Sequence, residues 1–228
     1  MKIGILGSGL MGGKLGTLFA RAGHDVTFSY ARSRHKLQRL ARQAKGKGHT
    51  RAGTPAEAAE GADVLLLAVH WQRITDVLRQ AGDLSGKIII TCSMPMSADD
   101  TRLVVAHTSS GAEELAKKAR RARVVSAFGT VPSEVLFSVF STRRRAKRPS
   151  LAYCGDDTRA KAVAATLIRD VGFEPVDGGR LRVARYLEPF TLLMAQLAYE
   201  GRGGPKVAYR FERFTTGVNS RLVSGSES

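Results

Sequence analysis

The chain opens with IGILGSGLMGGK at residues 3–14, where a short apolar run leads into closely spaced glycines and then into a helical pattern. Its glycines have the G-x-G-x-x-G spacing of a dinucleotide-binding turn between a strand and a helix. Gly7 permits the tight turn, Gly9 lets the backbone approach a pyrophosphate, and Gly12 allows close packing of helix on strand. The partial positive charge of the helix N-terminus attracts the phosphates. The predicted cofactor-binding residues of this turn are Gly7, Ser8, Gly9, Leu10, Met11 and Gly12.

Strand and helix signals alternate with short connections through the first 155 residues, which is typical of a parallel sheet covered on both faces. Caps are expected at Thr54, at Ser110 and at Asp157 or Thr158, and Val183–Glu200 reads as a long apolar helix. We therefore predict an α/β fold of the Rossmann type, a doubly wound parallel sheet with a small C-terminal helical part. The predicted strands are Lys2–Leu6, Asp25–Tyr30, Val64–Val69, Lys87–Cys92, Arg123–Phe128, Ser150–Cys154 and Glu174–Asp177.

The end of the second predicted strand decides which dinucleotide is expected. An NAD enzyme places Asp or Glu there to bind the ribose hydroxyls. Here no acidic residue occurs from Val26 to Ala56, whereas eight Lys or Arg do. A guanidinium and a hydroxyl suit a 2′-phosphate, which a carboxylate would repel. The sequence thus predicts NADP(H), with a pocket made by Arg32 and by Ser29, Tyr30 or Ser33, and with Arg34 and Lys36 as outer charges.

Ligands of open α/β sheets bind beyond the C-terminal ends of the strands, so the residues that follow three strands are candidates for a reaction site. These stretches offer small, apolar and aromatic groups that suit a flat ring beside a nicotinamide. They lack a convincing acid/base pair, and His70 is the one titratable group in place. His70 is as readily a residue that shapes the site as a proton donor. The stretches are Ala68–Trp71, Thr91–Pro95 and Ala127–Pro132.

Composition bounds the class of protein. The 36 Lys and Arg against 20 Asp and Glu give a net charge of +16, which attracts polyanions such as phosphorylated cofactors. The charges are spread and no nucleic-acid motif accompanies them, so nucleic-acid binding is not expected. No apolar run approaches the length of a membrane helix, and no signal peptide is evident. Cys92 and Cys154, both in predicted strands, are expected to be free buried thiols in the cytoplasm, with no metal site.

Three blocks carry a resemblance to a known family. Val124–Phe128, Tyr153–Asp157 and Gly172–Leu181, followed by the Glu188-Pro189 helix, are similar in content and order to the coenzyme F420-dependent NADP oxidoreductases. The cytosolic NADPH-oxidising domain of the six-transmembrane metalloreductases shares these blocks. The resemblance extends to about Tyr209. It implies hydride transfer between NADP(H) and coenzyme F420 or a flavin such as FMN or FAD, in a homodimer.

Such a reaction passes a hydride directly between two stacked rings, which is compatible with the missing acid/base pair. The resemblance implies where each ring lies. Nicotinamide neighbours would be Ser8, Ser93, Pro95 and Val131, at the strand ends that also carry Val69, His70 and Ala127. Neighbours of the second ring would be Trp71, Phe128, Gly129, Thr130, Leu193 and Met194.

This chain departs from the family's pattern at three places. Gly129 stands where the archaeal deazaflavin enzymes carry His, and His70 where they carry Pro. The segment 142–148 is unusually basic, and is interpreted either as a solvated loop or as a contact for an anionic substrate tail. The expected organisation is an NADP-binding Rossmann domain at 1–155, a smaller part at 156–210 that completes the second-substrate site, and a tail at 211–228 with a frayed end.

Two other functions remain open from the sequence. A reductase of small carbonyl or imine substrates shares such glycine turns, but adds a long helical domain for which little chain follows Gly179. A catalytically inactive NADP(H)-binding sensor would be favoured by the basic segment and the tail.

Overall fold

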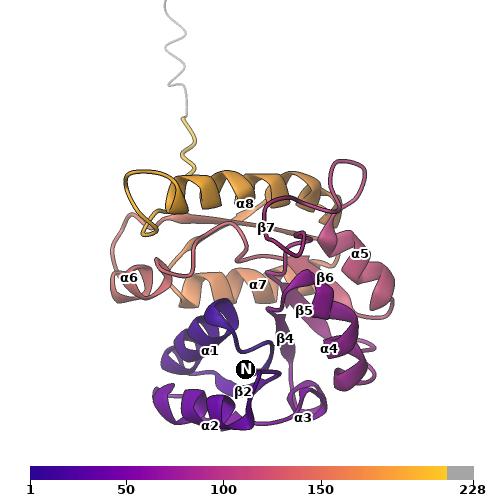
Figure 1. The fold of residues 1–228 in the computed structure, drawn as a ribbon. Coiled ribbons are helices and arrows are strands. Elements are labelled where there is room, and N and C mark those ends of the chain that lie inside the picture. The colour runs from indigo at the N-terminus through magenta and orange to yellow at the C-terminus, as the bar shows by residue number, and fades with distance from the viewer. Residues whose placement is uncertain (215–228) are drawn as a thin grey trace, which may run out of the picture.

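A single eight-stranded sheet organises the computed structural model, which describes residues 1–214 (Figure 1). The strand order is β3-β2-β1-β4-β5-β6-β7-β8. Successive strands from β1 to β3 lead to one edge of the sheet, and those from β4 to β8 lead to the other edge, so the order reverses between the neighbouring strands β1 and β4. The predicted Rossmann-type α/β fold is confirmed. The strands are β1 (Lys2–Leu6), β2 (Asp25–Ser29), β3 (Thr50–Ala52), β4 (Val64–Leu67), β5 (Ile88–Thr91), β6 (Arg123–Ser126), β7 (Ser150–Gly155) and β8 (Glu174–Asp177).

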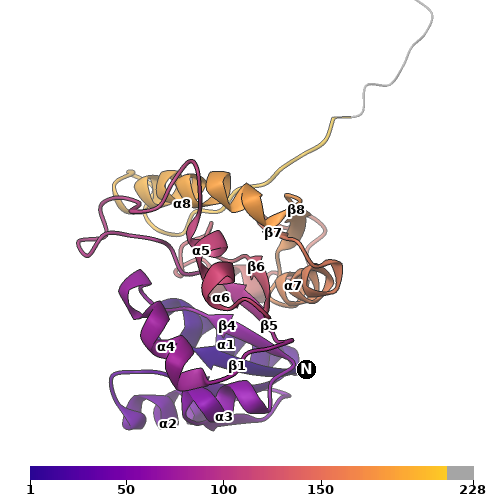
Figure 2. The same cartoon turned by 90° about the vertical axis from the view of Figure 1, so that its right-hand side faces the viewer.

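Helices cover both faces of the sheet and enclose two cores (Figures 1 and 2). One core lies under α1, α2, α6 and α7 and holds Phe19, Phe28 and Phe128. The other lies under α3, α4 and α5 and reaches the first turn of α8 through Ala184. The helices are α1 (Leu10–Ala22), α2 (Arg34–Gln43), α3 (Pro55–Glu60), α4 (Ile74–Ala81), α5 (Gly111–Lys118), α6 (Leu136–Ser141), α7 (Thr158–Asp170) and α8 (Ala184–Tyr199), with short 3-10 turns at Trp71–Arg73 and Leu181–Val183.

The predicted caps start the helices as expected. Thr54 closes a complete capping box with Glu57 at the start of α3. The hydroxyl of Ser110 accepts the backbone N–H of Glu113 in α5. Of the two candidates for α7, Asp157 is the cap, because its carboxylate accepts the N–H of Ala160.

The structure differs from the predicted all-parallel sheet at β7, which runs antiparallel to β6. A parallel connection needs a crossover that carries the chain back along the sheet. The connection from β6 to β7 contains only the six-residue helix α6, so the chain enters β7 from the C-terminal end of β6. The 13-residue α7 does supply such a crossover, and β8 is parallel to β7.

Other differences are local. The strand β3 was not predicted, because its three residues Thr-Arg-Ala lie half-exposed at the sheet edge and show no apolar pattern. Several strands end one or two residues earlier than predicted, and Cys92 therefore follows β5 rather than lying within it. The predicted domain boundary after residue 155 coincides with the end of β7, within a sheet that continues into β8.

Beyond α8 the chain returns to the sheet. The Tyr209 carbonyl accepts the N–H of Ser150, and the Tyr209 hydroxyl lies 2.7 Å from the hydroxyl of Thr130 and 2.8 Å from the N–H of Ala152. Tyr209 thereby ties the last described residues to β7 and to the loop after β6. Within residues 1–214 no helix is long and apolar enough to cross a bilayer. The predicted frayed end, 224–228, falls outside the described residues.

Candidate active site

The glycine turn joins β1 to α1 in a conformation that requires its glycines. Gly7 has φ of 113°, in the left-handed region. A Cβ on Gly12 would overlap the carbonyl oxygen of Gly7, whereas a Cβ on Gly9 would meet nothing within 4 Å. No side chain caps α1, and its first turn carries no acidic residue. The N-terminal N–H groups of α1 are therefore available to an anion at the open side of Gly9.

Ser8 faces β2 rather than the strand ends where a nicotinamide was expected. It is fully buried, and its hydroxyl donates to the carbonyl of Ser29 at 2.9 Å. The N–H of Ser8 donates to the carbonyl of Tyr30 at 3.1 Å. Both polar groups of Ser8 thus hold the turn against β2. The expectation that the Ser8 side chain neighbours the nicotinamide does not fit this orientation.

The predicted 2′-phosphate pocket is only partly assembled by the structure. Arg32, Ser33 and Arg34 are exposed at the start of α2, with Lys36 half-buried beside them. The Ser33 hydroxyl accepts the N–H of Lys36 as the N-cap of α2, which leaves its own proton free to donate. None of the ion pairs within residues 1–214 involves Arg32, Arg34 or Lys36. Arg32, Arg34 and Lys36, with the hydroxyl of Ser33 among them, form an unneutralised basic rim beside the glycine turn.

Ser29 and Tyr30 are turned away from that rim, contrary to the prediction. Ser29 is fully buried, and its hydroxyl donates to the carbonyl of Ile5 at 2.7 Å. Tyr30 has a positive φ of 54°, and its hydroxyl donates to Asp76 of α4 at 2.7 Å. Burial, followed by the bond to Asp76, raises the pKa of Tyr30 to about 12. Tyr30 therefore bridges β2 to α4 instead of offering its hydroxyl to a phosphate.

A small cavity lies at the other end of the predicted site, between the C-terminal ends of β5 and β6 and helix α8. Its volume is about 10 Å³, which is room for about one water. Ser93, Ala127, Gly129 and Thr130, all predicted site residues, line it. The Ser93 hydroxyl also accepts the N–H of Val69, and so links the ends of β4 and β5. The structure thus brings these four residues together around one space.

Other predicted neighbours of the two rings face elsewhere. Phe128 is fully buried, and its ring packs edge-on against Phe19 with centroids 6.0 Å apart. Val131 is buried in the same core. Pro95 is buried against Gly111, where a Cβ would lie 2.8 Å from its ring. The predicted side-chain contacts of Phe128 and Val131 with a ring are therefore wrong for this structure, because both side chains complete the core.

Helix α8 presents different residues to the strand ends than predicted. Leu193 is 53% exposed on the outer face, and Met194 is buried. The residues of α8 that line the cavity are Leu187, Glu188 and Thr191, one turn earlier. The apolar pattern of α8 could not reveal this, because apolar residues occur on several sides of the helix.

The stretches that follow the strands contain no acidic candidate for a reaction site, but Glu188 of α8 lies beside them and lines the cavity. It is 4% exposed, and its carboxylate accepts the N–H groups of Gly111 at 2.9 Å and Ala112 at 3.0 Å, at the N-terminus of α5. Burial raises the pKa of Glu188 to about 7, against the lowering effect of the two hydrogen bonds. Reasoning from the sequence missed this residue, because no motif links it to Gly111, 77 residues earlier.

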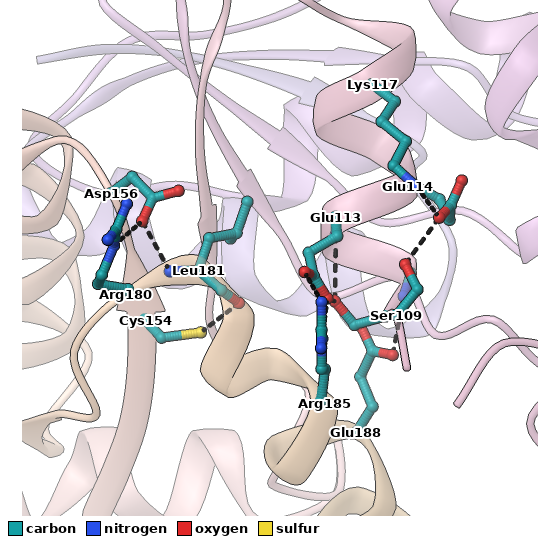
Figure 3. A network of polar contacts seen from close by, with 12 residues as sticks. Ser109, Glu113, Glu114, Lys117, Cys154, Asp156, Arg180, Leu181, Arg185 and Glu188 are labelled. Atoms are coloured by element: carbon teal, nitrogen blue, oxygen red, sulfur yellow. Dashed lines mark hydrogen bonds and ion pairs between the residues drawn. The ribbon is translucent and has the colours of Figure 1, made fainter. Parts of the chain in front are cut away.

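Arg185, one turn before Glu188 on α8, forms an ion pair with a different carboxylate, that of Glu113. Its guanidinium donates to both oxygens of Glu113, at 2.9 and 2.7 Å, and lowers the pKa of that carboxyl (Figure 3). The Ser110 hydroxyl also donates to Glu113. Glu188 therefore stays without a cationic partner among the described residues, even though Arg185 is on the same helix.

The remaining predicted groups are more peripheral. His70 is exposed, with its carbonyl bonded to the N–H of Arg73, and Trp71 packs partly buried against the second core. Cys92 and Cys154 are free thiols, and burial raises the pKa of each to about 12. Within residues 1–214 no group of three or more His, Cys, Asp or Glu side chains is arranged to hold a metal.

Comparisons with known proteins agree with the motifs. Residues 2–95 match the family described as NADP oxidoreductase, coenzyme F420-dependent. Metalloreductase STEAP3 from Rattus norvegicus is 27% identical over 84% of this chain. The chain spans only 36% of the length of that relative.

Solved structures share the fold. A protein from Arthrobacter sp. FB24, assigned as an F420-dependent NADP reductase, superposes with a TM-score of 0.81, at 24% identity over 93% of this chain and all of its own. Hypothetical protein SMa0349 from Sinorhizobium meliloti gives 0.71 at 23% identity, covering 93% and 96% of the two chains. A reductive aminase from Aspergillus terreus, solved with NADPH and ethyl-5-oxohexanoate, gives 0.61 at 20% identity over 86% of this chain and 60% of its own. The similarity to the coenzyme F420-dependent NADP oxidoreductase family thus covers residues 2–95, the part of the chain that holds the glycine turn.

Proposed function

We propose that this protein binds NADP(H) across the N-terminus of α1 and the start of α2. The observation that carries the proposal is the unneutralised basic rim of Arg32, Ser33, Arg34 and Lys36 beside the glycine turn. A 2′-phosphate needs charge and hydrogen-bond donors at this place, and a pyrophosphate needs the uncapped first turn of α1. Within this stretch, Arg32 and Ser33 would hold the 2′-phosphate.

The reaction we propose is hydride transfer between NADP(H) and a deazaflavin such as coenzyme F420, or a flavin. NADPH would supply the hydride when bound, and NADP⁺ would accept it in the reverse direction. The chain's own residues would orient two flat rings and exclude water, and Gly129, which carries no side chain, lies at the strand ends beside the water-sized cavity. The match of residues 2–95 to the coenzyme F420-dependent NADP oxidoreductases supports this acceptor class. Trp71, half-buried after β4, is the proposed aromatic wall of the site.

We also propose that the protein acts in the cytoplasm as a homodimer. The two free thiols suit a reducing compartment. Helix α8 carries Tyr186, Leu193 and Leu197 exposed along one side, an apolar stripe that a second copy could cover. Light scattering coupled to gel filtration measures the mass, and a monomer at micromolar concentration would contradict the dimer.

An acceptor screen tests the reaction. NADPH oxidation, followed at its absorbance band by stopped flow, should be supported by F420, FMN or riboflavin better than by small ketones or imines. The opposite ranking would favour the carbonyl or imine reductase. NADPH binding without turnover on any acceptor would favour the inactive sensor.

A further inference from the structure

We propose that Glu188 stores the proton that must accompany the hydride and releases it through the water-sized cavity to the second substrate. The inference rests on the proposed function, and it assigns a chemical role to a residue that also joins α8 to the N-terminus of α5. Its basis is the position of Glu188, which lines the same cavity as Ser93, Gly129 and Thr130.

The chemistry requires such a group. Reduction of a deazaflavin or flavin ring by NADPH consumes one hydride and one proton, and NADPH provides only the hydride. In the proposed step the O–H bond of Glu188 breaks, its electron pair stays on the carboxylate, and the proton bonds to a ring heteroatom of the reduced acceptor. The carboxylate then takes a new proton from solvent, so the net reaction uses NADPH, acceptor and one solvent proton.

The surroundings of Glu188 favour a group that changes protonation near neutral pH. Buried ionisable groups without a charge partner in a cleft are typical of functional acids and bases. Three titratable groups face it from neighbouring elements: Glu113 from α5, Cys154 from β7 and Cys92 from the end of β5. Both thiols are neutral at pH 7, and the negative charge of Glu113 disfavours ionisation of Glu188. The two N–H groups of α5 then stabilise the carboxylate after the proton has left.

Enzyme variants separate the role of proton donor from a purely structural role of Glu188 as an anchor between α8 and α5. The results that follow are those expected for the proton donor. Glu188→Gln should lower kcat with FMN or F420 at pH 7 by about 100-fold, the order expected for loss of an acid catalyst, with an unchanged Kd for NADPH. Glu188→Asp, which keeps an ionisable carboxyl group, should recover part of kcat and a pH-dependent profile. Glu114→Gln is the matched control, since this carboxylate of α5 pairs with Lys117 and is not among the residues that line the cavity.

A second measurement is independent of turnover. The carboxylic acid C=O band of Glu188, identified by its loss in Glu188→Gln, should disappear with a midpoint near pH 7 in an infrared titration of the wild-type protein. Thermal unfolding of each variant checks that it is folded.

The outcomes separate the two proposals. Ionisation of Glu188 at the ordinary value for glutamate, or a Glu188→Gln protein with wild-type kcat and pH profile, overturns the Glu188 role alone. A wild-type protein that binds NADPH and reduces none of these acceptors overturns the proposed function and the Glu188 role with it.

Discussion

The hydroxyl of Tyr30 donates a 2.7 Å hydrogen bond to the carboxylate of Asp76, and so joins the end of β2 to the first turn of α4. Arg79 and Gln80 donate to the same carboxylate. The bond from Tyr30, together with those from Arg79 and Gln80, lowers the pKa of Asp76 to about 2.

Removal of the Tyr30 hydroxyl should change the pKa of Asp76. In Tyr30→Phe the pKa of Asp76 should rise toward the ordinary value, because its largest stabilising bond is lost. A carboxylate with a lowered pKa stabilises the fold above its unfolded pKa, and this contribution is lost as pH falls through the folded value. NMR titration of the Asp76 carboxyl measures the shift, and an unchanged pKa would show that the bond is not formed in solution.

The basic rim should discriminate between the two nicotinamide cofactors. Arg32→Ala should weaken NADPH binding by about 10- to 100-fold, because a hydrogen bond to a charged group is lost, and should affect NADH little. Fluorescence titration with each cofactor gives both Kd values. Arg39→Ala, a neighbouring exposed cation farther along α2, is the control. Equal losses for the two cofactors would contradict the 2′-phosphate assignment.

Two glycines of the same turn should respond differently to a methyl group. Gly12→Ala should destabilise the protein by at least about 1–3 kcal/mol, because its Cβ would overlap the carbonyl of Gly7. Gly9→Ala should keep the melting temperature, since nothing lies within 4 Å of the added Cβ, and should lose NADPH affinity. Calorimetry and binding on both variants test the pair. A stable Gly12→Ala protein, or tight NADPH binding by Gly9→Ala, would contradict the proposed geometry.

The stability of the fold should decrease with pH through Glu188. Between roughly pH 4.5 and 7 an unfolded glutamate has lost its proton while the folded Glu188 retains it, so the free energy of unfolding falls by about 3 kcal/mol across this window. Urea unfolding at several pH values measures the slope, which Glu188→Gln should abolish. Glu114→Gln should keep it, because hydrogen bonds from Lys117 and Ser109 lower the pKa of Glu114 and place its titration below the window.

Substitutions in the basic segment 142–148 should affect KM for an anionic acceptor but not for an uncharged one. Arg144 and Arg145 are exposed, whereas the guanidinium of Arg143 lies 3.9 Å from the centre of the Phe140 ring and donates to the Phe140 carbonyl. If the segment binds an anionic substrate tail, replacing Arg144 and Arg145 by Ser should raise KM for F420 and leave KM for uncharged riboflavin unchanged. If the variant has the same KM as the wild type for F420, and likewise for riboflavin, the segment belongs to the solvated surface.

The sequence by itself determined the fold class, the glycine turn and the helix caps, because each depends on residues close together in the chain. The spacing of Gly7, Gly9 and Gly12 and the caps at Thr54 and Ser110 are local geometry. The absence of acidic residues after β2 likewise needed no contact to be noticed.

Only the tertiary structure decided where individual side chains point and which distant groups meet. The short helix α6 made β7 antiparallel, and core packing took Phe128 and Val131 away from the predicted site. Tyr30 donates a hydrogen bond to Asp76 on α4, and Glu188 accepts hydrogen bonds from N–H groups at the start of α5. Burial and hydrogen bonding between elements far apart in sequence depend on the packing of the whole sheet and its helices, and that packing raises the pKa of Glu188.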